Sequence, residues 1–357
     1  MGFRAVYKLW YGIAVLITFL LAAFTAVGAF SQFCHPQNHP FVTIAGMLLP
    51  GMLLLDFVIA LYWIFRKKYW FLFPIFAIIV NYNYLLSVIQ ISSERDYKQK
   101  ILTVASFNVK GFNREITGYT VKKIARYLDE KKVDIVCLQE IFWNDRFKKD
   151  SVFRAFNAYP YKLSPVGISG RPRIAIFSKY PIISSYFLPF PNSENCGMWA
   201  DIRLNNEIVR IYNVHMQTTS FNSERAKFVR ESRIDGFEGE EQAVYEMKQT
   251  LVSNFVKRAV QADVISRSIA KSVYPIIVCG DFNDTPASYT YHRIKGKLKD
   301  SFRETGKGYG YTYRGIGRLL RIDYILYSPT MVGISYYSPS FNWSDHNMVI
   351  SQISLSE

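Results

Sequence analysis

Three long apolar segments near the N-terminus constrain the fold of this chain most strongly. Residues 9–30 contain no charged side chain, and a helix of that length crosses a hydrocarbon core about 30 Å thick. Residues 41–65 contain one charge and a Pro50-Gly51 pair, and residues 69–90 contain none. The first segment is longer than the apolar part of a removable signal peptide, and it lacks a small-residue cleavage site. We therefore expect three transmembrane helices at about 9–30, 41–65 and 69–90.

The basic residues around these segments predict how the chain is oriented. Arg4 and Lys8 precede the first segment, the loop 31–40 has no Lys or Arg, and residues 66–68 (Arg-Lys-Lys) lie between the second and third segments. Short cytoplasmic loops carry the excess of Lys and Arg. The pattern predicts an integral inner- or plasma-membrane protein with a cytoplasmic N-terminus. Everything after Gln90 is then periplasmic or extracellular.

Three polar side chains interrupt the second and third segments. An intramembrane carboxylate is costly and suggests function, whereas polar side chains in membrane helices also hydrogen-bond between helices. We interpret Asp56, Asn81 and Asn83 in the second way, and leave the role of Asp56 open.

Charge and hydrophobicity are segregated along the chain. The 357 residues are 50% hydrophobic yet carry a formal charge of +15, and residues 96–357 alone contain 37 basic against 26 acidic side chains. The hydrophobic and aromatic content excludes a disordered chain, and four cysteines exclude a disulfide-stapled scaffold. We predict a membrane domain at 1–95 and a soluble domain at 96–357 whose partner is anionic.

The soluble region alternates short β-branched or aromatic runs with turns and helical stretches, which is typical of an α/β domain. Seven runs are predicted as strands: 102–108, 135–139, 173–178, 208–215, 275–280, 322–327 and 348–353. Residues 240–271 have apolar side chains at helical spacing. Residues 218–240, which mix basic and phenylalanine side chains, are predicted as an insertion. It could form a substrate-binding flap, an amphipathic contact with anionic lipid, or a solvated surface segment.

Polar side chains that can bind a metal ion or transfer a proton follow several of these apolar runs. If the predicted strands meet at one edge of a sheet, these groups converge there. Carboxylate and amide oxygens suit Mg²⁺ or Mn²⁺ better than zinc, and histidines transfer protons near neutral pH. The pattern favours metal-assisted displacement at phosphorus. The residues are Asn108, Glu140, His215, Asp281, Asn283, Asp323, Asp345 and His346.

In these motifs the soluble region resembles the endonuclease/exonuclease/phosphatase superfamily, which includes deoxyribonucleases, neutral sphingomyelinases and inositol polyphosphate 5-phosphatases. The resemblance spans about residues 100–355, with the motifs in the family's order. It implies a four-layered α/β sandwich, two packed β-sheets flanked by helices. His215 stands where abasic-site endonucleases carry another residue, which argues against a DNA-repair enzyme of that branch.

The resemblance also implies a metal centre. Asn108 and Glu140 match the metal-binding pair, with Glu140 the main Mg²⁺ ligand, and Asp345 completes the metal shell directly or through water. The number of metal ions stays open.

Five further residues match the groups that act on the phosphate. His346 is the base or transition-state histidine, oriented by Asp323, and Asp281 positions or deprotonates the attacking water. Asn283 and His215 hold the phosphoryl oxygens. The resemblance leaves open whether Asp281 or His346 takes the proton.

These expectations combine into a membrane-anchored, Mg²⁺-dependent phosphoesterase that hydrolyses a phosphodiester. A lipid-linked or membrane-derived substrate is favoured, because tethering holds the site beside it at high effective concentration. An extracytoplasmic nuclease is the main alternative, since the basic domain suits a polyanion. Another phosphate ester, and a catalytically silent binding protein of the same fold, also remain.

Overall fold

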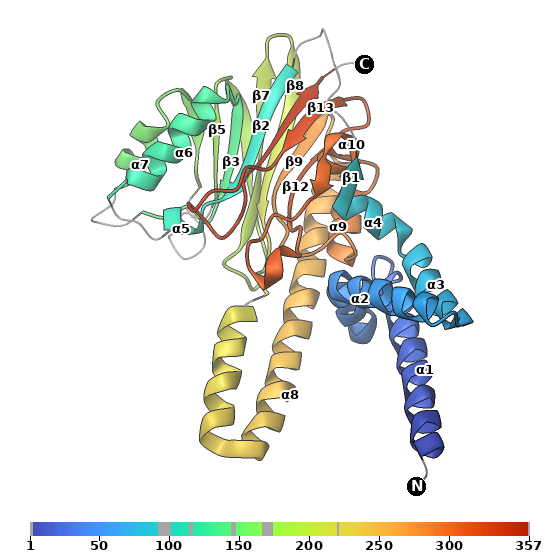
Figure 1. Cartoon of the computed structure of the whole chain (residues 1–357). Helices are drawn as coiled ribbons and strands as arrows, with labels where there is room; N and C mark the ends of the chain where they lie inside the picture. Colours follow the sequence, from blue (N-terminus) through green and yellow to red (C-terminus); the bar gives the residue numbers. More distant parts are fainter. Residues whose placement is uncertain are drawn as a thin grey trace.

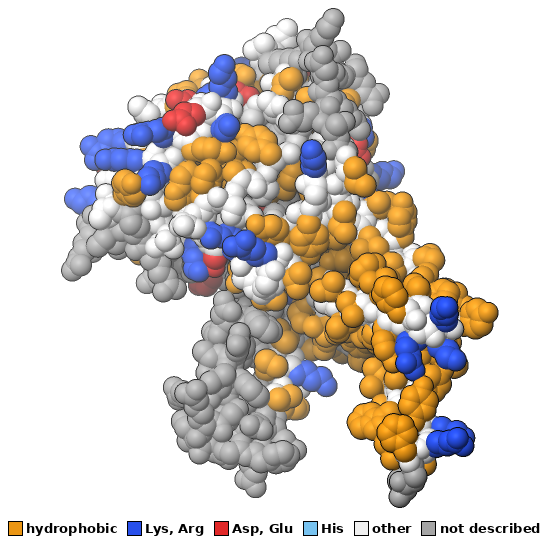
Figure 2. Space-filling view, viewed as in Figure 1, with side chains coloured by type: hydrophobic (Ala, Val, Ile, Leu, Met, Phe, Trp, Pro, Cys, Tyr) orange, Lys and Arg blue, Asp and Glu red, His pale blue; other side chains and the backbone are white. Residues whose placement is uncertain are grey.

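The N-terminal apolar segments form a compact helical bundle. The computed structural model describes residues 3–91, 101–113, 117–143, 148–165, 174–219 and 221–355, without the side chains of 221–243. The bundle consists of α1 (Phe3–Gly28), α2 (Pro40–Phe65), the 3-10 turn η1 (Tyr69–Phe71), α3 (Leu72–Val80) and α4 (Tyr82–Val88). Its surface is largely apolar in Figure 2, with basic side chains near the end away from the sandwich.

Contacts at both ends of the bundle show that α1 and α2 are antiparallel. Gly28, at the end of α1, packs so closely on α2 that an added Cβ would lie 2.7 Å from the Leu49 side chain. At the other end the Arg66 guanidinium donates to the Tyr7 hydroxyl at 2.8 Å. Arg66 therefore lies beside the start of α1, as the predicted orientation requires.

The third predicted helix is broken, which corrects the expectation of one continuous helix at 69–90. Among the described residues two helices, α1 and α2, are long and apolar enough to cross a membrane, and the pair 69–80 and 82–88 is bent by 61°. The break falls at Asn81, whose backbone leaves helical dihedral angles (φ −92°, ψ 16°). Its side-chain amide donates to the carbonyl groups of Thr25 in α1 and Ala77, both at 3.0 Å. Asn81 thus forms the interhelical hydrogen bond that the sequence predicts.

Asp56 is fully buried in α2, and neither of its carboxylate oxygens has a hydrogen-bond partner among the described residues. The carboxylate interacts with the Thr25 side chain of α1 outside ordinary hydrogen-bond geometry, so the interhelical hydrogen bond of Asp56 stays a prediction.

Two six-stranded mixed sheets form the core of the region that follows the bundle (Figure 1). The first has the order β13-β14-β2-β3-β5-β4 and the second β10-β12-β9-β8-β7-β6. The strands of the first sheet are β2 (Ile101–Asn108), β3 (Ile135–Gln139), β4 (Tyr161–Leu163), β5 (Ile174–Ser178), β13 (Val332–Tyr337) and β14 (Val349–Ser354). Those of the second are β6 (Ile182–Pro189), β7 (Cys196–Leu204), β8 (Glu207–His215), β9 (Ile276–Asp281), β10 (Lys299–Asp300) and β12 (Asp323–Tyr327).

The sheets pack face to face, with helices on the outside. Val104, Cys137, Ile211 and Cys279, two from each sheet, belong to one buried apolar cluster that fills the space between them. The outer helices of the first sheet are α6 (Tyr119–Glu130) and α7 (Lys149–Ala155), and those of the second are α8 (Phe221–Ala270) and α9 (Tyr289–Lys295). This arrangement gives the four layers that the resemblance implies.

All seven predicted strands are present, and α8 includes most of the predicted insertion at 218–240. The backbone of α8 is helical from Phe221, and in Figure 1 its ribbon projects away from the sandwich and turns back on itself. The side chains of 220–243 lie outside the described residues, so the three interpretations of this segment stay predictions. The predicted domain boundary at 95/96 also lies outside the described residues.

The bundle and the sandwich are joined through backbone pairing and a buried ion pair. Strand β1 (Ile89–Ile91), directly after α4, pairs antiparallel with β11 (Lys307–Tyr309). The Arg321 guanidinium donates to the Ser87 carbonyl at 2.6 Å and to both Asp300 carboxylate oxygens at 2.5 and 2.7 Å. Arg321 is 1% exposed, so these partners must offset the cost of burying its charge. This contact fixes the end of α4 on the sandwich.

We predict that Arg321→Leu lowers the stability of the detergent-solubilised protein by about 3–5 kcal/mol, because it leaves the buried Asp300 carboxylate without its cation. The matched control is Arg318→Leu, at an exposed position, which should change stability by less than about 0.5 kcal/mol. Denaturant unfolding followed by tryptophan fluorescence measures both. Equal stability of the two variants would show that the Arg321 contact contributes little.

Candidate active site

The candidate site forms where strands of both sheets end at the same edge. Strands β2 and β3 are parallel, with Asn108 opposite Gln139, so Glu140 follows directly beside Asn108. In the other sheet β8 and β9 are parallel, with His215 opposite Asp281. Strand β12 runs antiparallel to β9, and its first residue, Asp323, lies opposite Asp281. The strand-end groups predicted from the sequence are thereby brought together.

Gly280 allows β9 to approach β8 closely, immediately before Asp281. Its φ is 153°, and an added Cβ would lie 2.0 Å from the Val214 carbonyl oxygen. No other residue type fits without moving one of the two strands. The glycine therefore sets the position of the Asp281 carboxylate.

Three residues of the site have a left-handed backbone. Lys110, Glu140 and Asn283 have φ values of 46°, 51° and 52°, each just after a strand. This conformation is uncommon for residues other than glycine, and such backbones concentrate at functional sites. The abrupt change of chain direction places a polar side chain directly at each strand end.

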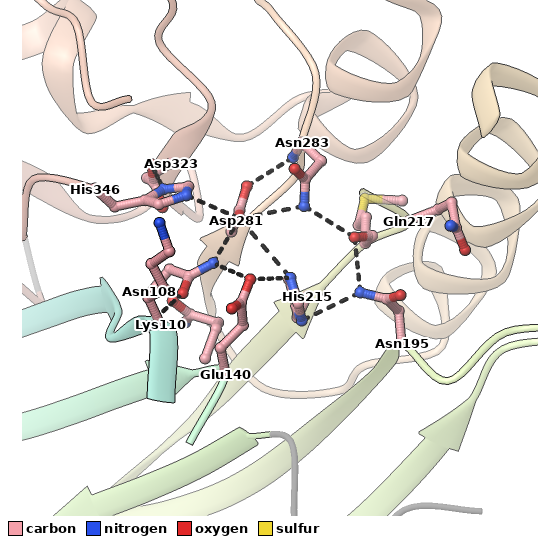
Figure 3. Close-up of polar contacts among 12 residues, drawn as sticks. Asn108, Lys110, Glu140, Asn195, His215, Gln217, Asp281, Asn283, Asp323 and His346 are labelled. Carbon is pink, nitrogen blue, oxygen red and sulfur yellow. Dashed lines mark hydrogen bonds and ion pairs between the residues drawn. The ribbon is translucent and has the colours of Figure 1, made fainter. Parts of the chain in front are cut away.

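The Asn108 side-chain amide links the two sheets (Figure 3). Its Nδ2 donates to Glu140 Oε1 and to Asp281 Oδ2, both at 2.9 Å. Its Oδ1 accepts the Lys110 backbone N–H at 3.0 Å, which fixes the amide orientation. One neutral donor thus holds together two carboxylates that would otherwise repel each other.

His215 faces the two carboxylates with its Nε2, 3.5 Å from Glu140 Oε1 and 3.8 Å from Asp281 Oδ2. The Asn195 side-chain nitrogen donates one hydrogen bond to the Met216 carbonyl at 2.9 Å and lies 3.1 Å from His215 Nδ1. Since the bond to Met216 shows that this atom is the amide nitrogen, it also donates to His215 Nδ1. His215 Nδ1 is then an acceptor, so the proton is on Nε2. This tautomer is compatible with donation to a phosphoryl oxygen, and that role of His215 stays a prediction.

His346, Asp323 and Asp281 form a buried acid–base group. His346 Nδ1 lies 2.9 Å from Asp323 Oδ2, and its Nε2 lies 3.8 Å from Asp281 Oδ2. Burial alone would lower the pKa of His346, but the Asp323 and Asp281 carboxylates outweigh it and raise the pKa to about 10. Burial, and next the Asp323 charge, raise the pKa of Asp281. The imidazole is thus held charged between two carboxylates.

Asn283 and Asp345 differ in how closely they join this network. The Asn283 backbone N–H donates to Asp281 Oδ1 at 2.8 Å, and its side chain donates to Asp281 Oδ2 at 3.2 Å. The Asp345 carboxylate instead forms an ion pair with Lys110 Nζ at 2.6 Å. Its role as a metal ligand stays a prediction.

Some of these groups line a cavity of about 520 Å³. Glu140, Asn283, Asp345 and His346 contribute to its polar side. Arg258, also in the lining, is fully buried and paired with Asp284 at 3.2 Å. The cavity is large enough for a phosphate group together with part of what it esterifies.

The donor set fits a hard divalent cation. Ligand atoms of Glu140, His215 and Asp281 lie within 4.8 Å of one another, and so do those of Asp281, Asp323 and His346. Carboxylate oxygens dominate both groups, which suits Mg²⁺ or Mn²⁺. Within these groups His215 directs Nε2–H toward the carboxylates and His346 is paired with Asp323, which leaves Glu140 and Asp281 as the groups best placed to contact an ion. The ligand roles of Asn108, Glu140 and Asp345 stay predictions.

Two polar groups of the site were not predicted from the sequence. Lys110 follows Asn108 by two residues and pairs with Asp345, and its position directly after a motif strand is a signal that could have identified it. Asn195 precedes β7, a strand that the sequence did not predict, so no pattern placed it beside His215.

The comparisons with known proteins assign the fold to one family. The family model described as "Endonuclease/Exonuclease/phosphatase family" matches residues 105–346. The chain therefore belongs to the endonuclease/exonuclease/phosphatase family, whose members are metal-dependent phosphoesterases that generally use divalent ions. A second model, described as a domain of unknown function, matches residues 11–88. No curated protein matches the chain.

Solved structures of this family share the fold at low sequence identity. The endonuclease/exonuclease/phosphatase from Bacteroides vulgatus is 20% identical, with a TM-score of 0.53 over 72% of this chain and 100% of that one. The protein from Beutenbergia cavernae is 15% identical, with a TM-score of 0.53 over 72% of both chains. D. rerio TDP2, complexed with a single-strand DNA product, is 14% identical, with a TM-score of 0.52 over 72% of this chain and 100% of that one.

We predict that Glu140→Gln weakens Mg²⁺ binding at least about 100-fold, since loss of a ligand should exceed the 10- to 100-fold effect of losing an outer-shell group. Isothermal titration calorimetry with MgCl₂ measures this directly. The matched control is Glu207→Gln, at an exposed position at the start of β8, which should bind as the parent does. Unchanged affinity in Glu140→Gln would remove Glu140 from the metal site.

Proposed function

We propose that this protein is a membrane-anchored, Mg²⁺-dependent phosphoesterase that hydrolyses a phosphodiester of a membrane lipid by attack of water at phosphorus. One observation carries the choice of substrate. The cavity that contains Glu140 and His346 is also lined by Met47 and Leu48 of the membrane-type helix α2. A catalytic cavity with a wall from such a helix favours a substrate in the bilayer.

The residues of the chain divide the chemistry between them. Asp281, oriented by hydrogen bonds from Asn108 and Asn283, positions the attacking water and accepts its proton. His346, held by Asp323, and the Nε2–H of His215 donate to the phosphoryl oxygens, where negative charge develops. These donors lie at fixed positions before substrate binds.

A divalent ion held by Glu140 and Asp281 would supply further neutralisation of phosphoryl charge. Asn108 holds these two carboxylates together, and Asp345, 2.6 Å from Lys110, is placed to join the metal shell directly or through water.

We propose that the protein lies in the inner or plasma membrane, with a cytoplasmic N-terminus and a periplasmic or extracellular catalytic region. In support, Arg66 contacts Tyr7 at the bundle end away from β1 and β11. The broken pair 69–88 would act as a third span, so that the catalytic region lies opposite the basic end.

A nuclease is the second candidate. The excess of basic side chains in 96–357 suits a polyanion, and the similar D. rerio TDP2 was solved with a single-strand DNA product. Within the described lining of the cavity, however, the α2 residues are apolar, which suits a lipid better than a phosphate backbone.

We predict that the full-length protein in nanodiscs releases a phosphorylated or free headgroup from phosphatidylethanolamine, phosphatidylglycerol or sphingomyelin when Mg²⁺ is present. The substrate panel also contains plasmid DNA, RNA and an inositol phosphate. Mass spectrometry detects lipid products and gel electrophoresis detects nucleic acid cleavage.

Glu140→Ala and His346→Ala should each lower the rate at least about 100-fold, because each removes a group that acts on the reacting phosphate. Salt-sensitive cleavage of nucleic acid without lipid hydrolysis would establish the nuclease alternative. Binding of these ligands without turnover, unchanged in Glu140→Ala, would establish the silent binding protein.

A further inference from the structure

The cavity has a second, apolar side that comes from two segments far apart in the sequence. Met47 and Leu48 belong to α2, and Ile316 and Leu320 belong to the loop between β11 and β12. Leu48 is 37% exposed and Ile316 is 42% exposed. The same cavity therefore joins the catalytic groups to apolar side chains that are themselves accessible from outside.

The depth of Leu48 in the bilayer follows from the length of α2. Leu48 precedes Phe65, which adjoins the basic residues 66–68, by 17 residues, or about 26 Å along a helix. A hydrocarbon core is about 30 Å thick. With the basic residues in one headgroup layer, Leu48 lies just inside the opposite boundary between acyl chains and headgroups.

The loop that carries Ile316 has a strained backbone and is tied to the catalytic histidine. Ile316, Gly317 and Arg318 have φ values of 46°, 65° and 59°, and a β-branched residue rarely adopts such an angle. Tyr313, earlier in the loop, pairs with His346 through a backbone bridge, and their rings lie 5.2 Å apart. The loop is thus held in place from the active-site side while Ile316 stays exposed.

The exposed tip of this loop has the composition of a segment that contacts a membrane surface. Ile316 is apolar and Arg318, also exposed, is basic. Such combinations insert an apolar side chain into the interface while the cation meets anionic lipid headgroups.

We propose that the opening between α2 (Met47, Leu48) and the loop 313–320 (Ile316, Leu320) is a lateral portal to the active site. It admits a phospholipid from the outer leaflet, so that the apolar chain remains against these four side chains while the phosphodiester reaches Glu140 and His346. This inference rests on the proposed lipid phosphodiesterase activity. It adds the path by which the lipid enters the site and the side chains that contact its apolar chain.

The test compares two substrates in the same full-length protein. In nanodiscs of phosphatidylethanolamine and phosphatidylglycerol (3:1) with Mg²⁺, headgroup release is measured beside hydrolysis of water-soluble bis(4-nitrophenyl) phosphate. Leu48→Arg and Ile316→Arg should lower the ratio of lipid to soluble hydrolysis at least about tenfold. Leu48→Trp, which narrows the opening without adding charge, should also lower it and guards against misfolding of Leu48→Arg.

The matched control is Phe33→Arg, because Phe33 is 74% exposed at the same end of the bundle and is outside the cavity lining. This variant should keep the parent ratio. A ratio unchanged in Leu48→Trp and Ile316→Arg, in a protein that does cleave the lipids, overturns the portal alone. If the parent cleaves only the soluble ester, the proposed lipid activity fails and the portal with it.

Discussion

The hydrogen bonds of the Asn108 amide to Glu140 and Asp281 are the interaction on which the site depends most. The two carboxylates come from different sheets, and two anions at this separation in a buried site would repel each other. One amide with two N–H groups resolves this conflict and also fixes the relative position of the sheet edges. His215, His346 and Asn283 then occupy positions set by these two carboxylates.

The second constraint is the attachment of the bundle to the sandwich. Pairing of β1 with β11 and the buried Arg321–Asp300 contact, which includes the Ser87 carbonyl, fix the end of α4 on the sandwich. Because α1 and α2 pack antiparallel, α2 begins at the same end and places Met47 and Leu48 in the cavity wall. The helical bundle therefore contributes to the proposed active site, and in the proposed membrane arrangement its depth would determine which phosphates reach Glu140.

Local patterns predicted much of this structure because the polar groups of the candidate site follow apolar strands directly. The strands ending at Asn108, His215 and Asp281 are apolar runs that end in a polar residue. Because parallel strands end at the same edge of a sheet, these polar side chains are brought together. Strand β6 was missed because most of its residues are exposed and it contains two serines. The bend at Asn81 depends on a hydrogen bond to Thr25, 56 residues away. The contribution of α2 to the cavity is likewise a tertiary contact that no local pattern encodes.

The depth of residue 48 tests the central claim, that the catalytic cavity opens at the membrane surface, most directly. A spin label on Leu48→Cys, in a background with Cys34→Ser because the other three cysteines are buried, reports its accessibility to oxygen and to a water-soluble nickel chelate in nanodiscs. We expect a depth within about 5 Å of the boundary between headgroups and acyl chains. A label freely accessible to the chelate, or one near the midplane about 15 Å deep, would contradict the account.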